Sequence, residues 1–381
     1  MTRPNDGAQP LLNRLAGLVP DMQARAAALD ARGAFPDEDL AELRRIGALA
    51  APLPRALGGL GAGTEPAGAA TVLAVLRLLG RGNLSVGRLF EAHVNALRLV
   101  VRHGTPEQAE HVARDTRDGH LFGLWVTDRP GDPLALRDGR LWGTKSPCSG
   151  AGHCTRALLT AETGDGTCMV IAALDGTEEV TPLSDALHGM RASATGAVRF
   201  AGTPAATVGR PGDYLREPDF SAGAWRTSAV TLGGMDALLD AARDGLLARG
   251  HGGLPLQQER FGLALIARET ARLWMERAAE VAEAEDTSEA ASEGAFEGAP
   301  GGTPEAPSAA DRVAYVNLAR IAVETACLDM LRHVQRSLGL AAFVRPHPVE
   351  RLTRDLGIYL RQPAPDLVLT EAAAHLLARP G

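Results

Sequence analysis

Apolar residues recur with a period near 3.6 over the first third of the chain. This spacing gives each segment one apolar face and is typical of amphipathic helices. Four segments share it and are predicted to be helices: 11–33, 37–50, 66–80 and 84–102. From about residue 120 the period changes to two. Short apolar runs separated by Gly, Asp, Pro and Ser then predict the strands of a small β domain: 121–128, 139–146, 156–163, 167–174 and 196–202.

The helical period returns in the last part of the chain, and long helices joined by short breaks favour an antiparallel bundle. Five helices are predicted there: 220–249, 257–283, 309–337, 348–361 and 366–378. Residues 284–311 are acidic, rich in Gly, Pro, Ser and Ala, and poor in large apolar groups. Such a segment cannot offset its ordering entropy, so we predict a disordered insertion.

The pattern therefore predicts a mainly α protein with a central β domain. Its expected parts are an N-terminal helical domain (1–119), a middle β domain (120–210) and a C-terminal helical bundle (211–381). In the stretch RPHPVERLTRDLGIYLRQPAPD, Pro348 suits a first helical position and Pro363 ends that helix. Asp366 is the predicted N-cap of the last helix.

Composition narrows the class of protein. A chain of 381 residues with 45% hydrophobic residues is expected to fold into two or three domains. The net charge is −7 and no Lys/Arg-rich block occurs, which argues against a nucleic-acid partner. The N-terminus lacks an apolar signal region, and no run of 18 apolar residues occurs, so we expect neither export nor membrane insertion but a cytoplasmic protein.

Two residue types were considered for chemistry. The four cysteines, at 148, 154, 168 and 327, show no CxxC spacing, so no metal site is predicted and buried thiols are expected. His93 lies on the apolar face of the 84–102 segment. A core histidine is the default interpretation of that placement, and a role in a site is the alternative if a cofactor lies nearby.

Four words in the sequence carry a resemblance to a known family. They are LRRIGALAAPLPRALGGLG (43–61), HGMRASATGAVRF (188–200), QQERFG (257–262) and PVERLTRD (348–355). In these words, and in its order of helices, β domain and bundle, the chain resembles the acyl-CoA dehydrogenase family over nearly its whole length. The resemblance implies a small β-barrel, a C-terminal four-helix bundle, bound FAD and a homodimer or homotetramer.

The resemblance also assigns roles to single residues. Thr127 and Ser149 match hydroxyls beside the flavin, and Arg260 matches an arginine that meets the FAD pyrophosphate, usually from a neighbouring subunit. A guanidinium suits that role because it offers a bidentate fork to phosphate oxygens. Gly339 falls where a glycine lets FAD lie close to the backbone. Arg226 matches a substrate-side arginine.

Several positions depart from the family pattern. Pro133 replaces a serine that helps to hold the cofactor diphosphate, and Leu340 replaces the second glycine of a late pair. Pro363 stands where the family has the glutamate that removes the substrate α-proton. The alternative base position, used by a subset of the family, holds Trp225. Neither of the two known positions of the base therefore holds a carboxylate.

Replacement carboxylates were sought near the first bundle helix. Glu217, Asp219 and Asp236 lie there in sequence, but nothing in the pattern aims them at a flavin, and solvation at the surface is the favoured interpretation. The catalytic residue is therefore unassigned, with His93 and Ser149 as candidates.

Three hypotheses follow. The first is an FAD-dependent oxidoreductase acting on CH–CH groups of an acyl thioester, bound to CoA or a carrier protein, or of a related small molecule, with an unidentified base. The second is a flavin-dependent monooxygenase of the same fold, which needs no C–H base. The third is a non-catalytic binding or scaffold protein that retains the fold, which the changes at Pro133 and Leu340 motivate.

Overall fold

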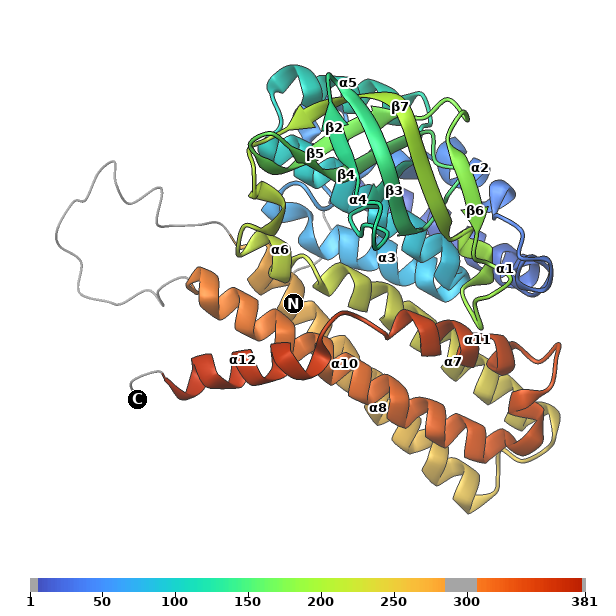
Figure 1. The fold of residues 1–381 in the computed structure, drawn as a ribbon. Helices are drawn as coiled ribbons and strands as arrows, with labels where there is room; N and C mark the ends of the chain where they lie inside the picture. Colours follow the sequence, from blue (N-terminus) through green and yellow to red (C-terminus); the bar gives the residue numbers. More distant parts are fainter. Residues whose placement is uncertain (1–5, 285–306, 379–381) are drawn as a thin grey trace.

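The computed structural model describes residues 6–284 and 307–378. Most of the predicted disordered insertion therefore lies outside the described residues. The protein is mainly α with a central β domain, and Figure 1 shows the β domain above a layer of long helices. The helices before the β domain are α1 (Gln9–Arg32), α2 (Asp37–Arg45), α3 (Ala69–Gly82), α4 (Leu84–His103) and α5 (Pro106–Arg117).

The sequence analysis missed helix α5. The helix begins with a capping box, in which the Gln108 N–H donates to Thr105 Oγ1 (3.3 Å) and the Thr105 N–H donates to Gln108 Oε1 (3.0 Å). Pro106 occupies the first helical position. These residues were a readable start signal, since a capping residue followed three positions later by Gln satisfies two helix-end donors at once.

Seven strands form the β domain: β1 (Phe122–Trp125), β2 (Ala135–Arg137), β3 (Arg140–Cys148), β4 (Arg156–Thr163), β5 (Gly166–Ala173), β6 (Glu179–Pro182) and β7 (Gly196–Val208). Five were predicted, whereas the short strands β2 and β6 were not. The strand order is β1-β4-β2-β3-β7-β5, and pairing of β5 with β4 closes the sheet into a barrel.

The helices after the barrel are α6 (Asp219–Ala222), α7 (Trp225–Ala248), α8 (Pro255–Ala282), α10 (Ala309–Leu338), α11 (Pro348–Tyr359) and α12 (Pro365–Leu377). Helices α7, α8 and α10 pack against one another, and α12 lies along α10 (Figure 1). One predicted helix start was wrong. Helix α12 begins at Pro365 after Ala364, which adopts φ 48°, so Asp366 lies within the first turn.

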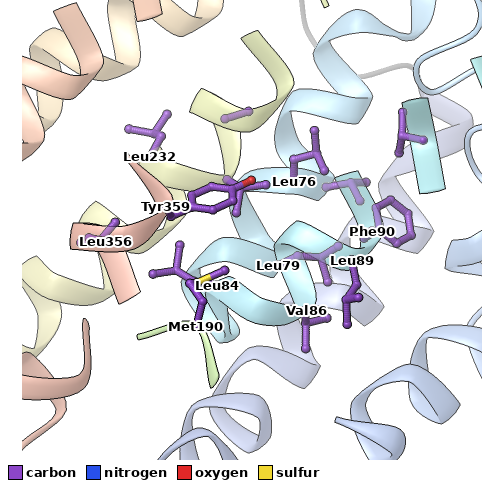
Figure 2. Close-up of a cluster of buried hydrophobic side chains, with 14 of the residues drawn as sticks. Leu76, Leu79, Leu84, Val86, Leu89, Phe90, Met190, Leu232, Leu356 and Tyr359 are labelled. Atoms are coloured by element: carbon purple, nitrogen blue, oxygen red, sulfur yellow. The ribbon is translucent and has the colours of Figure 1, made fainter. Parts of the chain in front are cut away.

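Helices α3 and α7 cross at close range, which joins the N-terminal helices to the bundle. A Cβ at Gly80 would lie 2.1 Å from the Val230 carbonyl oxygen, and one at Gly233 would lie 2.0 Å from the Arg77 carbonyl oxygen. Only glycine permits this approach. Figure 2 shows the core beside the crossing, where side chains from both parts of the chain meet: Leu76, Leu79, Leu84, Leu232, Leu356 and Tyr359.

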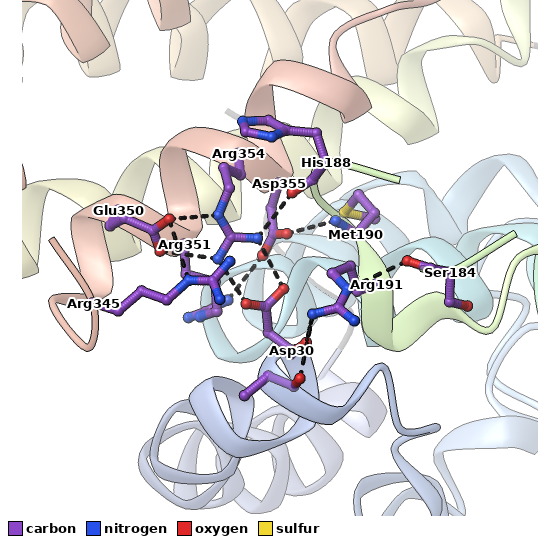
Figure 3. A network of polar contacts seen from close by, with 11 residues as sticks. Asp30, Ser184, His188, Met190, Arg191, Arg345, Glu350, Arg351, Arg354 and Asp355 are labelled. Atoms are coloured by element: carbon purple, nitrogen blue, oxygen red, sulfur yellow. Dashed lines mark hydrogen bonds and ion pairs between the residues drawn. The ribbon is translucent and has the colours of Figure 1, made fainter. Parts of the chain in front are cut away.

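A buried ion-pair network joins three distant segments (Figure 3). Arg354 of α11 pairs with Asp30 of α1 (2.6 Å) and with Glu350 (2.7 Å), and it donates to the His188 carbonyl (3.0 Å). The Arg191 side chain donates to the Asp30 carbonyl (2.9 Å), so Arg191 orders this turn. We call the contacts of Arg354 the Arg354 clamp.

Candidate functional site

Two hydroxyl side chains lie on segments that follow strands β1 and β3, which contact each other in the barrel. Thr127 follows β1 and Ser149 follows β3. The Ser146 N–H donates to the Thr127 carbonyl (3.0 Å), and Trp125 Nε1 donates to the Ser149 carbonyl (2.9 Å). Thr127 is exposed and Ser149 is half-buried, so a ligand can reach both hydroxyls. The structure therefore places the two residues predicted to lie beside a flavin on adjoining segments of the barrel.

A fully buried lysine supports the segment that carries Thr127. Lys145 Nζ donates to the Val126 carbonyl (3.0 Å) and to Thr160 Oγ1 (2.9 Å), and it pairs with Asp128 Oδ1 (2.7 Å). Burial lowers the pKa of Lys145, and the Asp128 carboxylate opposes that shift. Because all three ammonium hydrogens have acceptors, Lys145 fixes the chain on both sides of Thr127.

Arg260 and Gly339 lie together at one end of the helical bundle. Arg260, near the start of α8, donates from Nη1 to the Arg336 carbonyl (2.9 Å), and Gly339 ends α10. Gly339 has φ 61° and ψ −139°, a conformation open to glycine alone, and a Cβ there would face open space. This end of the bundle projects away from the barrel (Figure 1). A single chain does not bring these two residues to Thr127 and Ser149.

Arg226 lies in a buried polar cluster between α4 and α7. It is 2% exposed, pairs with Glu283 just beyond α8, and donates to Asn95 Oδ1 (3.1 Å). Glu283 also accepts from Arg98 (2.5 Å) and from Trp225 Nε1 (3.2 Å). Burial alone would raise the pKa of Glu283, but the two guanidinium groups outweigh it and hold the pKa low. Glu283 is therefore an ionised counter-charge.

The same cluster continues along α4 towards α11. Glu91 pairs with Arg88, accepts from the Asn95 amide, and accepts from Thr227 Oγ1 (3.4 Å). Burial, and then the charge of Glu91, raise the pKa of Tyr359 at the end of α11. We call this set the α4–α7 polar cluster, and its members are Arg88, Glu91, Asn95, Arg98, Arg226, Thr227 and Glu283.

The link between α11 and α12 carries no basic side chain. The Pro363 carbonyl accepts a hydrogen bond from Arg320 Nη2 of α10. Where the resemblance placed a carboxylate base, the structure has a backbone carbonyl held by a buried cation. The charged group at this position is therefore a cation, whereas abstraction of a proton needs a carboxylate anion.

The three replacement carboxylates already have partners. Glu217 accepts from the Ser221 hydroxyl, and Asp219 pairs with Arg102 (2.6 Å). Asp236 pairs with Arg77 (2.6 Å) and Arg268 (3.3 Å). Asp219 and Asp236 are therefore held by arginine and Glu217 by a serine of its own turn, so each of the three carboxylates is already engaged within the protein.

Comparison with known proteins agrees with this architecture. Residues 18–120 match the family model described as acyl-CoA dehydrogenase, N-terminal domain. The whole chain superposes on glutaryl-coenzyme A dehydrogenase in complex with glutaryl-CoA with a TM-score of 0.78 at 19% identity, covering 98% of this chain and 96% of that one.

The chain has the acyl-CoA dehydrogenase fold.

The chain is also similar to proteins that are not named as dehydrogenases. Dibenzothiophene monooxygenase of Mycolicibacterium goodii is 29% identical over 64% of this chain, and the match spans 57% of that protein. KijD3, solved with FMN and a dTDP-linked amino sugar, has a TM-score of 0.79 at 22% identity, covering 98% of this chain and 95% of that one. TdsC of Paenibacillus sp. A11-2, solved with FMN, has a TM-score of 0.76 at 21% identity, with 96% of each chain covered.

One candidate site residue, His93, lies in the core of this acyl-CoA dehydrogenase-fold protein. His93 is fully buried, its Nε2 lies 3.0 Å from the Leu49 carbonyl oxygen, and its Nδ1 accepts from the Phe122 N–H (3.2 Å). Both ring nitrogens are used, and burial lowers the pKa of His93 to about 4. These contacts favour the core histidine. Trp125, at the end of β1, is 2% exposed and also lies in the core.

Sequence reasoning missed three charged residues of the site: Lys145, Glu283 and Arg320. Lys145 had a readable signal, since it is an ionisable residue four positions after the buried Leu141 on the inward face of a strand. Glu283 had a weaker one, a carboxylate at the end of a helix, where the dipole disfavours it. Arg320 had none, because its partner is a carbonyl 43 residues away.

Metal sites and membrane-spanning helices are both absent from the part of the chain that the structure describes. The described residues contain no group of three or more His, Cys, Asp or Glu side chains placed to hold a metal ion. None of the helices that the structure describes combines the length and apolar character needed to cross a bilayer.

Proposed function

We propose that the protein is a flavin-dependent monooxygenase that oxygenates a small molecule. One observation carries the proposal. The position that the resemblance gives to the catalytic glutamate of a dehydrogenase holds Pro363, and the Pro363 carbonyl accepts a hydrogen bond from Arg320. Desaturation of an acyl thioester needs a carboxylate within reach of a C–H bond, and such a base contributes about 10²- to 10⁴-fold to the rate. Transfer of oxygen to a sulfur or nitrogen atom needs no such base.

The names of the relatives support this assignment. A dibenzothiophene monooxygenase matches in sequence, and the structure of methanesulfinate monooxygenase MsuC from Pseudomonas fluorescens matches with a TM-score of 0.76 at 22% identity, covering 97% of this chain and 98% of that one. Both are named for oxygenation of sulfur compounds. A sulfur or nitrogen compound is accordingly the proposed substrate class.

We propose FMN as the cofactor in place of the FAD expected from the sequence. FMN lacks the diphosphate that the serine replaced by Pro133 would help to hold, and FMN is the flavin in the KijD3 and TdsC structures. When bound, the flavin supplies the two-electron chemistry and the activation of oxygen. Thr127 and Ser149 would donate hydrogen bonds to its ring, and Lys145 would keep Thr127 in place.

A second subunit is proposed to complete the flavin site. Arg260 and Gly339 match cofactor residues but lie far from the barrel of their own chain. Helix α8 also exposes an apolar row with a common face, formed by Leu256, Leu263, Ile266 and Leu273, which are 64%, 39%, 63% and 54% exposed. Large apolar side chains exposed in such a row are typical of a protein interface. A homodimer or homotetramer would cover the row.

Acyl-thioester dehydrogenation is the second candidate. The α4–α7 polar cluster favours it, because Arg226 lies there with a buried Nε that has no hydrogen-bond partner. That atom could meet a substrate carbonyl or carboxylate. The difficulty is that both buried carboxylates of the cluster are paired with arginine.

The first experiment measures flavin binding and then reactivity. The full chain is titrated with FMN and with FAD, and quenching of flavin fluorescence is followed. We expect FMN to bind at least about tenfold more tightly, a difference of about 1.4 kcal/mol. In the reconstituted protein, a panel of acyl-CoA thioesters should leave the flavin oxidised under anaerobic conditions, whereas the reduced protein should transfer ¹⁸O from ¹⁸O₂ to sulfides or hydroxylamines.

Each alternative has a distinct outcome. Bleaching of the flavin by any acyl thioester would establish the dehydrogenase candidate. Failure to bind either flavin would favour the non-catalytic scaffold. Thr127→Val is the matched site variant, because valine keeps the shape of threonine and removes only the hydroxyl. We expect it to weaken FMN binding and to leave the unfolding temperature within a few degrees.

A further inference from the structure

Arg320 differs from the other buried arginines of the bundle. It lies on α10, is 8% exposed, and donates from Nη2 to the Pro363 carbonyl. Its Nε is buried without a hydrogen-bond partner, and among the described residues no carboxylate lies within ion-pair distance of it. A buried cation without a counter-charge costs several kcal/mol of desolvation.

Elsewhere the fold pairs such charges. Arg351 pairs with Asp355 at 3.0 Å, and Arg354 pairs with Asp30 at 2.6 Å. The carboxylate nearest to Arg320 along its own helix is Glu324, one turn later. That carboxylate points to Arg361, with 3.7 Å between Arg361 Nη1 and Glu324 Oε1. Glu324 therefore does not serve as the direct partner of Arg320.

Arg320 has a buried polar residue near it on its own helix, and the link that it contacts is exposed to solvent. Asn317, one turn earlier on the same face of α10, is 4% exposed. Pro363 and Ala364 in the contacted link are exposed, so a small solute can approach the link. Burial lowers the pKa of Arg320, and the charge of Glu324 opposes that shift. The guanidinium nevertheless stays protonated at neutral pH, because an arginine side chain is effectively always charged.

We propose that Arg320 and the link 360–364 form a binding site for an oxyanion, namely a carboxylate, sulfonate or phosphate group of a small ligand. A guanidinium presents a planar fork of donors that matches two oxygens of such a group. The Pro363 carbonyl occupies one arm of the fork, Nε lies buried without a partner, and the remaining Nη donors are available to the ligand. The site rests on this contact geometry alone and stands whether or not the protein is a monooxygenase.

The test compares anions at constant ionic strength. The flavin-free full chain is heated with 0 to about 20 mM acetate, methanesulfonate or inorganic phosphate, with sodium chloride making up the ionic strength. We expect one oxyanion to raise the unfolding temperature by about 2–4 °C with saturation, since a ligand stabilises the state that it binds. The anion with the largest effect identifies the chemical class. Equal effects of all the oxyanions and chloride would overturn the proposal.

Two variants locate the effect. Arg320→Met should abolish the oxyanion-specific shift, whereas Arg332→Met should keep it, because Arg332 is an exposed arginine of the same helix paired with Asp329. Persistence of the shift in Arg320→Met would contradict the proposal. If Arg320→Met fails to fold, hydrogen exchange on the wild-type protein decides. Added oxyanion should slow exchange in 316–324 and 359–366, and unchanged exchange there would sink the assignment.

Discussion

At the residue scale, Glu283 of the α4–α7 polar cluster occupies a position that its own helix disfavours. Glu283 lies just beyond the C-terminal end of α8, where the helix dipole disfavours a carboxylate. It is nevertheless 5% exposed and contacts Arg98, Arg226 and Trp225. Such a conflict between local preference and tertiary placement is expected at positions that serve the fold or the site.

Glu283→Gln should destabilise the protein strongly. The change leaves two buried guanidinium groups without their shared counter-charge, which costs about 3–5 kcal/mol. Because the folded-state pKa of Glu283 is lowered, its contribution is fully present above the ordinary glutamate pKa and is lost as the pH falls through the folded value. Urea unfolding from pH 7 to pH 3 measures both effects. Glu276→Gln on the same helix, 30% exposed at its side chain, is the control and should cost less than about 1 kcal/mol.

His93 should make stability depend on pH over a different window. Its pKa is about 4 in the folded protein, against an ordinary value of 6.5. Between these values the unfolded chain binds a proton that the folded chain does not, so stability falls by about 3 kcal/mol as the pH drops from 6.5 to 4. His93→Gln should flatten this part of the curve. His111→Gln, at an exposed histidine, should not, and equal slopes in both variants would refute the assignment.

At the scale of elements, agreement with the sequence follows the strength of the local pattern. The segment 84–102 was predicted and α4 spans Leu84–His103; the run 156–163 coincides with β4. Helix α5 was missed because it buries little, with Val112 as its one large apolar core residue. Strand β2 has three residues and β6 is mostly exposed, so neither carries a visible period.

Thr105→Ala tests the cap of α5. The variant removes one half of the capping box and should lower the free energy of unfolding by about 1 kcal/mol. Because α5 packs against α4, hydrogen exchange in 106–117 should accelerate more than exchange in α8. Thr105→Ser keeps the hydroxyl and is the matched control. A uniform change in exchange over both helices would show that the cap acts globally.

Only part of the candidate site could be predicted from the sequence, because some of its residues depend on partners that are distant along the chain. Thr127 and Ser149 lie in short motifs whose place at strand ends follows from the chain itself, and the structure places them on adjoining segments of the barrel. Lys145 and Arg320 act through partners 15 and 43 residues away, and Arg226 reaches Asn95 across 131 residues. Local periodicity contains no information about such pairings, which arise only when the domains pack.

At the scale of the whole molecule, the Arg354 clamp ties together helix α1, the connection between β6 and β7, and helix α11 (Figure 3). Arg354→Met should leave Asp30 as an unpaired buried carboxylate and cost about 3–5 kcal/mol. We also expect calorimetry to resolve two transitions where the wild type shows one. Arg361→Met, at an exposed arginine near the end of α11, should change stability by less than about 1 kcal/mol. One unbroken transition in Arg354→Met would mean that core packing alone couples the domains.

The contact between Arg320 and Pro363 also bears on how this branch of the fold could change its chemistry. A glutamate introduced at 363 would arrive beside a cation already in place, and the resulting ion pair would hold its pKa low. We therefore expect Pro363→Glu alone to show no desaturation of acyl thioesters in an anaerobic flavin-bleaching assay, and Pro363→Glu with Arg320→Leu to be the first step that frees the new carboxylate. A single substitution at position 363 would therefore not supply the free carboxylate that desaturation needs.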